Sequence, residues 1–241
     1  MKIFQTWKSR DPSTFTHIYK HCYGTWQIVH PECEHLFLDD NDIEEYCKKY
    51  FPEYYEDFIN LPSGILRADI IRYMVLYVEG GLYVDIDFMA LKNHSDIITI
   101  ANCSDKNIVF GKLSNGIIPN AWMMSLKKNE IFWLFVLKTS FSRCKNKNYR
   151  IEEMTGPDML TDCITYYTKN KDKLNYDNSF QFQSDILILP SVFIYPIDWS
   201  IGWYPTKPIE YDQLVKANTA SDEIMNIYPN SYAITFWNHN W

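Results

Sequence analysis

The chain carries little positive charge and has no basic stripe or arginine-rich run. It has 23 Lys and Arg residues against 30 Asp and Glu, a formal net charge of −7 over 241 residues. A surface that binds nucleic acid needs clustered basic side chains, so this composition argues against nucleic acid as a partner and against strong attraction to anionic lipid. It still allows a nucleotide ligand, whose negative charge a metal ion can neutralise.

Paired cysteines and long apolar runs are also missing. The six cysteines are scattered and none forms a C-x-x-C pair, which argues against a zinc knuckle or a thioredoxin-like site. No run reaches the roughly 18 apolar residues of a membrane span, and the first residues lack the apolar core of a signal peptide. We therefore expect reduced cysteines, no transmembrane segment and a cytoplasmic protein, or one peripheral to a membrane if its substrate lies there.

Hydrophobic residues are abundant, by contrast, at 46% of the chain, and aromatic residues make up 17%. This is enough for one large α/β domain or two small ones. Because no repeat, low-complexity linker or domain boundary is visible, we expect a single domain over residues 1–241. An aromatic surplus often lines pockets for nucleobases or sugars, although core packing explains most individual aromatic residues.

Short apolar runs alternate with helix signals, which is typical of an α/β fold. The predicted strands cover residues 3–7, 26–29, 36–38, 82–88, 185–189 and 232–237, with a further strand or extended segment at 191–195 and short elements at 97–100 and 108–110. The predicted helices cover residues 11–23, 39–50 and 63–79, one or two helices within 121–142, and a helix that opens at 155–158.

The most informative feature is a pair of acids, Asp85 and Asp87, in an apolar run that follows Gly80 and Gly81. In a strand, residues two apart point to the same face, so both carboxylates would project together from the end of a buried strand. Two such carboxylates repel each other and lose hydration. A divalent cation removes both penalties, so the pair predicts a metal site, and next a metal that holds a phosphate.

The helix predicted just before this strand carries Asp69 and Arg72, three residues apart and on one face. The plainest interpretation is an internal ion pair. Together with the acidic pair, however, the unit suits a ligand that has a diphosphate and a polyol. The metal would bridge two phosphates, while Asp69 accepts from sugar hydroxyls and Arg72 donates to sugar or phosphate oxygens.

Five segments carry a resemblance to a known family. They are residues 69–73 with 77–87, the opening 3–8, the Thr-Gly-Pro of 155–157, the closing 232–234, and the terminal Trp241. The first three resemble the DXD segment, the I-H-Q-T-W-K strand and the T-G-P helix start of glycosyltransferase family 32. The last two resemble the last strand and the tail of that family. That family includes inositol-phosphoceramide mannosyltransferases. The DXD unit is specific, whereas Q-T-W or T-G-P alone would be weak.

The resemblance implies an α/β protein of the GT-A fold, a Rossmann-like mixed sheet flanked by helices. It also implies an enzyme that transfers a hexose with retention of configuration. The donor would be a UDP- or GDP-sugar, the acceptor a glycan, a lipid or another hydroxyl compound, and the cofactor Mn²⁺ or Mg²⁺.

The same resemblance assigns roles to individual residues. It gives Asp85 and Asp87 to the metal and Asp69 and Arg72 to catalysis, as the groups that hold the donor sugar. Those assigned to the nucleotide and donor are Gln5, Thr6, Trp7, Tyr83, Asp85 and Trp241.

The chain departs from the family pattern at three positions. Phe4 replaces the second-position His, Thr235 stands where the family often has a His that could bind metal, and Asn240 stands where it often has Ser. The tail offers His239 as the substitute third metal ligand, although a tail histidine is more often a solvated residue.

Two mechanisms and two rival functions stay open. Retention can proceed through a covalent intermediate, for which Asp69 is the nearest carboxylate, or by front-face attack, which we favour. A D-x-D motif after an apolar strand also occurs in haloacid-dehalogenase-type phosphatases, usually near the N-terminus. The other rival is a sugar-nucleotide binder that has lost transfer, a reading suggested only by Thr235.

Overall fold

A mixed six-stranded sheet forms the centre of the protein. The structure, a computed structural model, describes residues 1–146, 148–170, 185–201 and 220–237. The strands of the main sheet are β1 (Lys2–Thr6), β2 (Glu34–Leu38), β3 (Gly81–Val84), β5 (Ile108–Gly111), β6 (Trp122–Ser125) and β7 (Ile186–Leu189), in the order β2-β1-β3-β6-β5-β7. β6 lies antiparallel to its neighbours β3 and β5, and the other pairs are parallel. A separate antiparallel pair joins β4 (Phe88–Ala90) to β8 (Ala233–Thr235).

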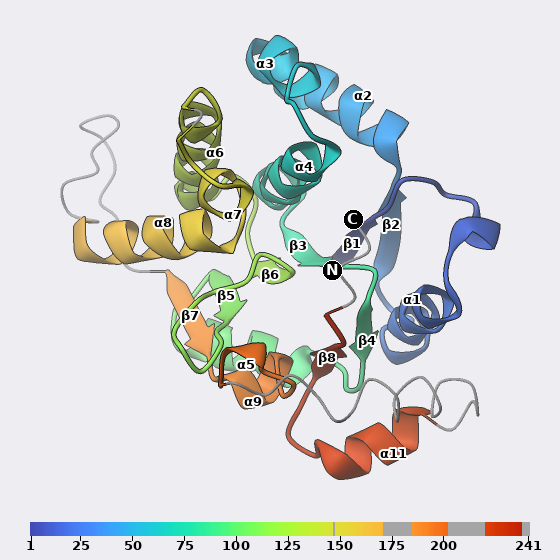
Figure 1. Ribbon diagram of the computed structural model, residues 1–241. Helices are drawn as coiled ribbons and strands as arrows, with labels where there is room; N and C mark the ends of the chain where they lie inside the picture. The colour runs from blue at the N-terminus through green and yellow to red at the C-terminus, as the bar shows by residue number, and fades with distance from the viewer. Residues whose placement is uncertain (147, 171–184, 202–219, 238–241) are drawn as a thin grey trace.

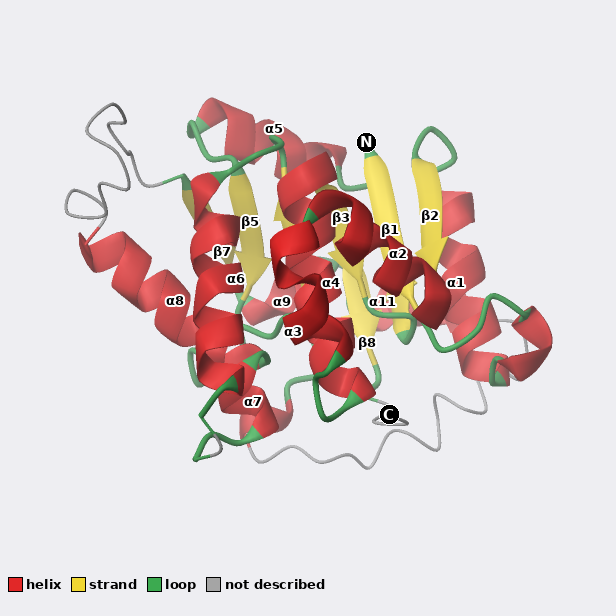
Figure 2. Ribbon diagram, turned by 90° about the horizontal axis from the view of Figure 1, so that it is seen from above, coloured by secondary structure: helices red, strands yellow, loops and turns green. Residues whose placement is uncertain are grey.

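Helices cover both faces of this sheet (Figures 1 and 2). One face carries α2 (Asp40–Tyr50), α3 (Tyr55–Ile59), α4 (Gly64–Glu79), α6 (Ile131–Cys144), α7 (Ile151–Met154) and α8 (Pro157–Asn170). The other carries α1 (His17–Val29), α5 (Ser95–Cys103), α9 (Ser191–Ile194) and α11 (Ala220–Ile227). Short 3₁₀ turns occur at Pro12–Thr14, Pro52–Tyr54 and Trp199–Ile201. Among the helices of the described ranges, none combines the length and the apolar character that crossing a membrane requires.

Helix α4 forms as predicted because both of its ends are marked in the sequence. The Ser63 side chain accepts a hydrogen bond from the Ile65 N–H and caps the start. At the other end Gly80 and Gly81 have φ of +64° and +93°, a region that other residues rarely adopt. A Cβ at Gly81 would lie 2.4 Å from the Lys2 carbonyl oxygen, so only glycine lets β3 start beside β1.

The sheet brings several segment ends to one edge. Strands β1, β2 and β3 run parallel and finish there at Thr6, Leu38 and Val84. Because β6 runs antiparallel to β3, its start at Trp122 pairs with Val84, so Asn120 and Ala121 reach the same edge. The carboxyl ends of parallel strands are the usual place for ligands in such sheets.

Several predicted elements are wrong. The prediction of a strand at residues 26–29 fails because this segment completes α1: Trp26 is fully buried while Ile28 is 78% exposed, a helical spacing. The predicted helix 11–23 becomes a 3₁₀ turn followed by α1 from His17. The segment predicted as strand or extended at 191–195 forms the single-turn helix α9 (Ser191–Ile194), and the Tyr195 N–H donates to the Ser191 carbonyl at 2.7 Å.

One further difference involves a buried run without alternation. Residues 122–125 form β6 rather than helix, while the short element predicted at 97–100 lies inside helix α5. Every residue of β6 is buried, because the strand lies between β3 and β5 with helices on both sides. A fully buried strand and a buried helix give the same apolar pattern in sequence.

Candidate active site

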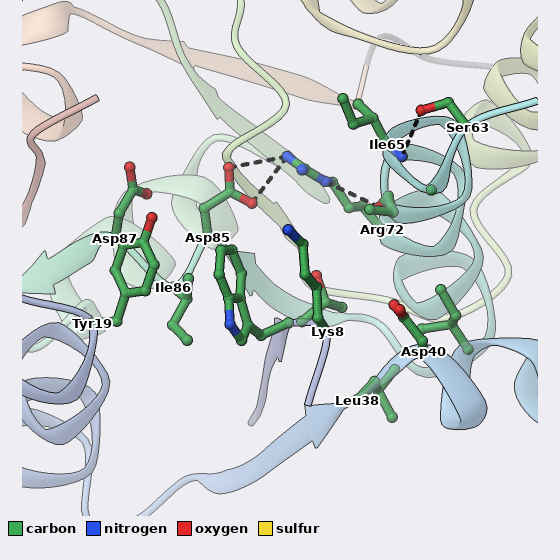
Figure 3. A pocket seen from close by; sticks show the side chains of 15 residues that line it. Lys8, Tyr19, Leu38, Asp40, Ser63, Ile65, Arg72, Asp85, Ile86 and Asp87 are labelled. Atoms are coloured by element: carbon green, nitrogen blue, oxygen red, sulfur yellow. Dashed lines mark hydrogen bonds and ion pairs between the residues drawn. The ribbon is translucent and has the colours of Figure 1, made fainter. Parts of the chain in front are cut away.

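The acidic pair lies in a turn at the edge of the sheet. The predicted strand 82–88 is wrong beyond Val84: β3 ends there, so Asp85 and Asp87 lie in the turn that follows rather than in the strand. The Asp85 N–H donates to the Ala121 carbonyl at 2.9 Å, and its carbonyl accepts from the Phe88 N–H at 3.1 Å. These two bonds fix the turn between β3 and β4. Figure 3 shows Asp85 between Asp87 and Arg72.

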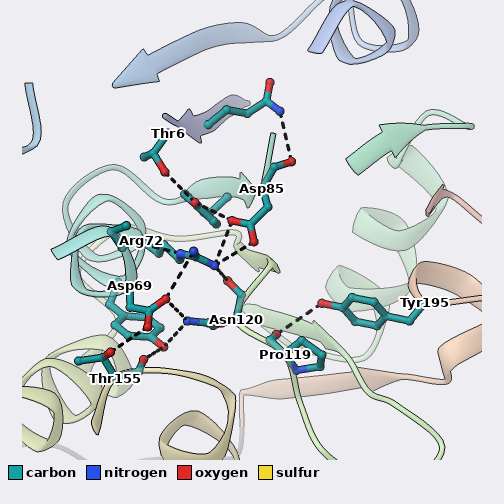
Figure 4. A network of polar contacts seen from close by, with 12 residues as sticks. Thr6, Asp69, Arg72, Asp85, Pro119, Asn120, Thr155 and Tyr195 are labelled. Carbon is teal, nitrogen blue, oxygen red and sulfur yellow. Dashed lines mark hydrogen bonds and ion pairs between the residues drawn. The ribbon is translucent and has the colours of Figure 1, made fainter. Parts of the chain in front are cut away.

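The Asp85 carboxylate is held by two neighbours. Arg72 Nη1 lies 3.0 Å from Oδ1 and 3.2 Å from Oδ2, and the Tyr83 hydroxyl donates to Oδ1 at 2.9 Å (Figure 4). Burial raises the pKa of Asp85, while Arg72 and the Tyr83 hydroxyl oppose this shift. For Arg72, burial would lower the pKa, but Asp85, Tyr83 and Asp69 outweigh it and raise the pKa. The guanidinium therefore stays charged.

Three residues assigned to the donor support Asp85 from the sheet. Tyr83 is fully buried beneath it, and its hydroxyl lies 3.0 Å from Thr6 Oγ1. Gln5 is 2% exposed and its Nε2 donates to the Asp85 carbonyl at 3.5 Å. The Arg72 guanidinium lies 5.0 Å from the centre of the Tyr83 ring, a cation–π distance. Of these three, only Thr6 also lines a cavity, the smaller of the two described below.

Asp69 is the centre of a second group of contacts. Its Oδ1 accepts from Asn120 Nδ2 at 2.9 Å and lies 3.4 Å from Arg72 Nη2, and its Oδ2 accepts from Thr155 Oγ1 at 2.8 Å. Burial raises the pKa of Asp69, and Arg72, Thr155 and Asn120 oppose the shift. The predicted Asp69–Arg72 pair is confirmed, and Figure 4 shows that it joins the Asp85 group through Arg72.

Asn120 and Thr155 are site residues that the sequence reasoning did not assign. The T-G-P motif held the signal for one of them: Thr155 bonds to Asp69, and Pro157 begins α8. Gly156 completes the motif, because a Cβ there would lie 3.0 Å from the Glu152 Cα and 3.6 Å from Asp69 Oδ2. No local pattern marks Asn120, which reaches the site through the direction of β6.

Two cavities meet at the acidic pair. The smaller, about 330 Å³, is lined by residues that include Thr6, Trp7, Lys8, Tyr19 and Asp40 (Figure 3). The larger, about 750 Å³, includes Asp69, Asn120, Arg150, Asp158, Trp199 and Trp237. Ile65, Arg72, Asp85 and Asp87 line both. A ligand with two different ends could therefore occupy both cavities at once.

Trp7 forms an aromatic wall of the smaller cavity. Its ring packs edge-to-face against Tyr19 with centroids 4.9 Å apart, and Lys8 Nζ lies 5.5 Å from its centre. Aromatic rings at such a site can stack on a planar ligand. The place of Trp7 beside a nucleobase stays a prediction.

The residues of the tail that the sequence assigned to the site fall outside the described part of the chain. His239 and Trp241 are outside the described residues. Thr235 lines the larger cavity, and its Oγ1 accepts from the Trp237 N–H at 3.1 Å. In this chain position 235 therefore supports the backbone of Trp237.

The residues at the acidic pair fit a divalent cation. Asp69, Asp85 and Asp87 contribute three acidic groups against one guanidinium, that of Arg72. Carboxylate oxygens are the donors that hard cations such as Mg²⁺ and Mn²⁺ prefer. Phosphate oxygens and water would complete the coordination of an ion held by Asp85 and Asp87.

A second group with metal-ligand chemistry, formed by His30, Glu32 and Cys33, fits less well. The Trp122 indole N–H donates to His94 Nε2 at 3.3 Å, which leaves the His94 proton on Nδ1 to donate to His30 Nε2 at 2.9 Å. His30 then carries its own proton on Nδ1, the atom that faces Glu32 at 3.7 Å. A metal would have to displace that proton.

Comparison with known proteins agrees with this geometry. Residues 16–105 match the glycosyltransferase sugar-binding region containing the DXD motif, a segment that includes Asp69, Arg72, Asp85 and Asp87. In three dimensions the chain is similar to PaToxG glycosyltransferase, with a TM-score of 0.53, 18% identity, and coverage of 71% of this chain and 70% of that one. This likeness confirms the predicted GT-A fold.

Several curated relatives are glycosyltransferases by name. The chain is 27% identical over 164 residues to an uncharacterized glycosyltransferase of Acanthamoeba polyphaga mimivirus, covering 66% of this chain and 59% of that protein. It is 23% identical over 243 residues to the initiation-specific alpha-1,6-mannosyltransferase of Candida albicans, covering 88% and 62%. Inositol phosphoceramide mannosyltransferase 3 of Schizosaccharomyces pombe is 33% identical over 86 residues, covering 35% and 23%.

The chain thus spans 59% and 62% of the length of the first two of these relatives. None of the three is named a phosphatase, which weighs against that alternative. With the DXD turn, the Asp69–Arg72 pair and the T-G-P helix start in one site, the chain is similar to the DXD-containing glycosyltransferases of family 32.

Proposed function

We propose that this protein transfers a hexose, with retention of configuration, from a UDP- or GDP-sugar to a hydroxyl of a glycan or lipid-linked acceptor, and that residues 1–241 act as one domain. The observation that carries the proposal is the position of Asp85 and Asp87 where two cavities meet. A nucleotide sugar has the matching shape: a base with ribose at one end, a diphosphate in the middle and a sugar at the other. The names of the relatives support the transfer of a hexose.

Asp85 and Asp87 would hold a divalent cation, Mn²⁺ or Mg²⁺, with His239 as the third protein ligand suggested by the sequence. When bound, the ion would neutralise the diphosphate and stabilise the charge that develops on the leaving group. The protein's part is to keep the carboxylates in place. Arg72 and Tyr83 do this for Asp85 through three contacts of 2.9–3.2 Å.

Arg72 and Asp69 are placed to hold the donor sugar and its phosphate. Arg72 lines both cavities and has a guanidinium whose pKa is raised, so it brings a permanent positive charge to the junction. Asp69 lies on the floor of the larger cavity with lone pairs left for sugar hydroxyls. Trp7 would face the base in the smaller cavity.

The contacts of Asp69 support front-face attack over a covalent intermediate. Both of its oxygens are engaged, Oδ1 by Asn120 and Arg72 and Oδ2 by Thr155. Hydrogen bonds and the Arg72 charge lower the nucleophilicity of these oxygens, so the contacts suit Asp69 to holding the sugar rather than to attacking the anomeric carbon. In the front-face route the departing phosphate accepts the proton of the acceptor hydroxyl, and no protein nucleophile is needed.

Incubation with radiolabelled UDP- and GDP-sugars and Mn²⁺ tests the proposal through donor hydrolysis and transfer. We expect turnover of at least one donor, and a loss of about 100-fold or more in Asp85→Asn and Asp87→Asn, the size typical for lost electrostatic stabilisation. Asp105→Asn is the control, since Asp105 is exposed and its φ of +53° is one that Asn also tolerates.

Each alternative predicts a different result. Donor binding without turnover would identify the non-catalytic binder. Full activity in both Asp→Asn variants would refute the metal assignment. NMR of the product's anomeric proton reports retention or inversion directly.

A further inference from the structure

Two tryptophans from distant segments meet on the wall of the larger cavity. Trp199 begins the 3₁₀ turn Trp199–Ile201, and Trp237 follows β8. Their ring centroids are 6.3 Å apart with an interplanar angle of 87°, and Trp199 is 40% exposed. An exposed indole ring on a cavity wall offers a flat apolar surface on which a ligand can pack.

The fold holds Trp237 in an unusual conformation. Its φ is +54°, a region that bulky residues rarely adopt. Three contacts keep it there. Its N–H donates to Thr235 Oγ1 at 3.1 Å, its indole N–H donates to the Ile197 carbonyl at 2.7 Å, and its ring stacks on Tyr195 at 5.5 Å. Strain that is so heavily supported is typical of ligand sites.

The residues at the floor of this cavity are much less exposed to solvent than those at its mouth. Asp69 and Asn120 are only 5% and 6% exposed and form the floor. Trp199 is 40% exposed, and the side chain of Arg150 is 70% exposed, so these two lie at the mouth. With a nucleotide in the smaller cavity and the diphosphate at the acidic pair, the donor sugar reaches the floor. The mouth is the space left for the acceptor.

We propose that the mouth of the larger cavity binds the acceptor as a pyranose ring that packs on Trp199, with Trp237 closing the wall behind it. This inference rests on the proposed function and deepens it by naming the acceptor class. One face of a pyranose presents C–H groups that suit an indole ring, while its edge presents hydroxyls. Arg150, Glu152 and Asp158 line the same cavity and offer partners for those hydroxyls. Arg150 Nη2 lies 3.3 Å from Asp158 Oδ2, and this polar, charged rim suits sugar hydroxyls better than a lipid chain.

A binding measurement tests the site without requiring turnover. Saturation-transfer NMR would use the full chain with UDP or GDP and Mg²⁺, which avoids the paramagnetism of Mn²⁺. The probes are the methyl pyranosides of α-mannose, α-glucose and β-galactose. We expect saturation transfer to the C–H face of at least one probe, and its loss in Trp199→Ala. Trp199→Phe should restore part of it, because a ring remains.

Kinetics give the second readout, the ratio of transfer to donor hydrolysis. We expect Trp199→Ala to lower this ratio about tenfold, the size of one lost aromatic contact. Tyr166→Ala is the control, because Tyr166 is a 51% exposed aromatic residue on α8 that does not line the cavity.

The outcomes separate the two proposals. If wild-type protein hydrolyses no donor, the proposed function fails, and the NMR experiment still decides the pyranose site. If donors are hydrolysed but no pyranoside binds, or if Trp199→Ala changes neither the NMR signal nor the ratio, the acceptor proposal is overturned. Transfer only to a lipid without a pyranose would overturn it as well.

Discussion

At the scale of single residues, Arg72 connects the charges of the site. It is 2% exposed and contacts both Asp69 and Asp85, and its Nη1 also donates to the Asn120 carbonyl at 3.0 Å. One guanidinium cannot balance Asp69, Asp85 and Asp87 together. The site therefore keeps a surplus of negative charge, which suits a divalent cation that brings a diphosphate.

Thr155 provides a prediction about the support of Asp69. Thr155→Val keeps the shape but removes the hydroxyl that donates to Asp69 Oδ2 at 2.8 Å, leaving a buried carboxylate with one donor fewer. We expect a loss of about 1–3 kcal/mol in the free energy of unfolding, measured with urea. Thr155→Ser keeps the hydroxyl and should lose clearly less. A larger loss in Thr155→Ser than in Thr155→Val would show that the methyl group, not the hydrogen bond, stabilises the protein.

The buried carboxyl of Asp69 leads us to predict that the free energy of unfolding depends on pH. Burial raises its pKa above the ordinary value of 3.8, so the folded state binds the proton more tightly than the unfolded state. The resulting stabilisation is complete below that ordinary value and is lost as the pH rises through the folded pKa. Asp69→Asn lacks this titration. The wild-type stability minus that of Asp69→Asn should therefore fall with rising pH, by at most about 1.4 kcal/mol per pH unit.

Urea unfolding of both proteins across a pH series checks this sign. A difference that grows with rising pH would show that Arg72 outweighs burial and that the pKa of Asp69 is lowered.

At the scale of elements, the turn from α4 into β3 sets the position of the acidic pair. Gly81→Ala places a methyl group 2.4 Å from the Lys2 carbonyl oxygen at a φ of +93°. We expect a loss of about 1–3 kcal/mol from the backbone strain alone, and more if β1 and β3 separate. Thermal or urea unfolding measures it.

Gly24→Ala is the matched control. Gly24 lies inside α1, and a Cβ there would meet nothing within 4 Å. This change should stabilise the protein by about 0.5–1 kcal/mol, because alanine favours helix over glycine. If Gly81→Ala and Gly24→Ala had the same free energy of unfolding, the close approach of Gly81 to the Lys2 carbonyl would not determine the stability of the protein.

The elements also show where prediction from sequence succeeds. Helix α4 has Ser63 and Gly80 as end markers, and α2 has the capping box of Asp39 and Asp42, so local signals were sufficient for both. Strand β6 has no such signal. Its identity follows from lying between β3 and β5, and neighbours in a sheet are not visible in a short apolar run.

At the scale of the whole molecule, the two cavities predict a joint stabilisation by ligands. A ligand that binds only the folded state stabilises it by mass action, by about 2.7 kcal/mol at 100 times its Kd. We expect UDP or GDP with Mn²⁺ to raise the melting temperature, and EDTA to remove the metal-dependent part of the increase. Differential scanning fluorimetry measures both.

Two comparisons make this experiment specific. Mn²⁺ alone should have less effect than Mn²⁺ with nucleotide, because the diphosphate supplies part of the coordination. Asp87→Asn should lose the metal-dependent part. A full metal effect in that variant would place the ion elsewhere.

The sequence by itself determined the helix 64–79, the glycine turn, the acidic pair and the Asp69–Arg72 pair, because their signals lie within about 25 residues of one another. Only the tertiary structure decided which side chains complete the site. Asn120 and Thr155 bond to Asp69 from 51 and 86 residues away, and Trp199 meets Trp237 only because the chain returns to β4 through β8. Contacts of this kind depend on strand order and direction, which no local pattern of residues encodes.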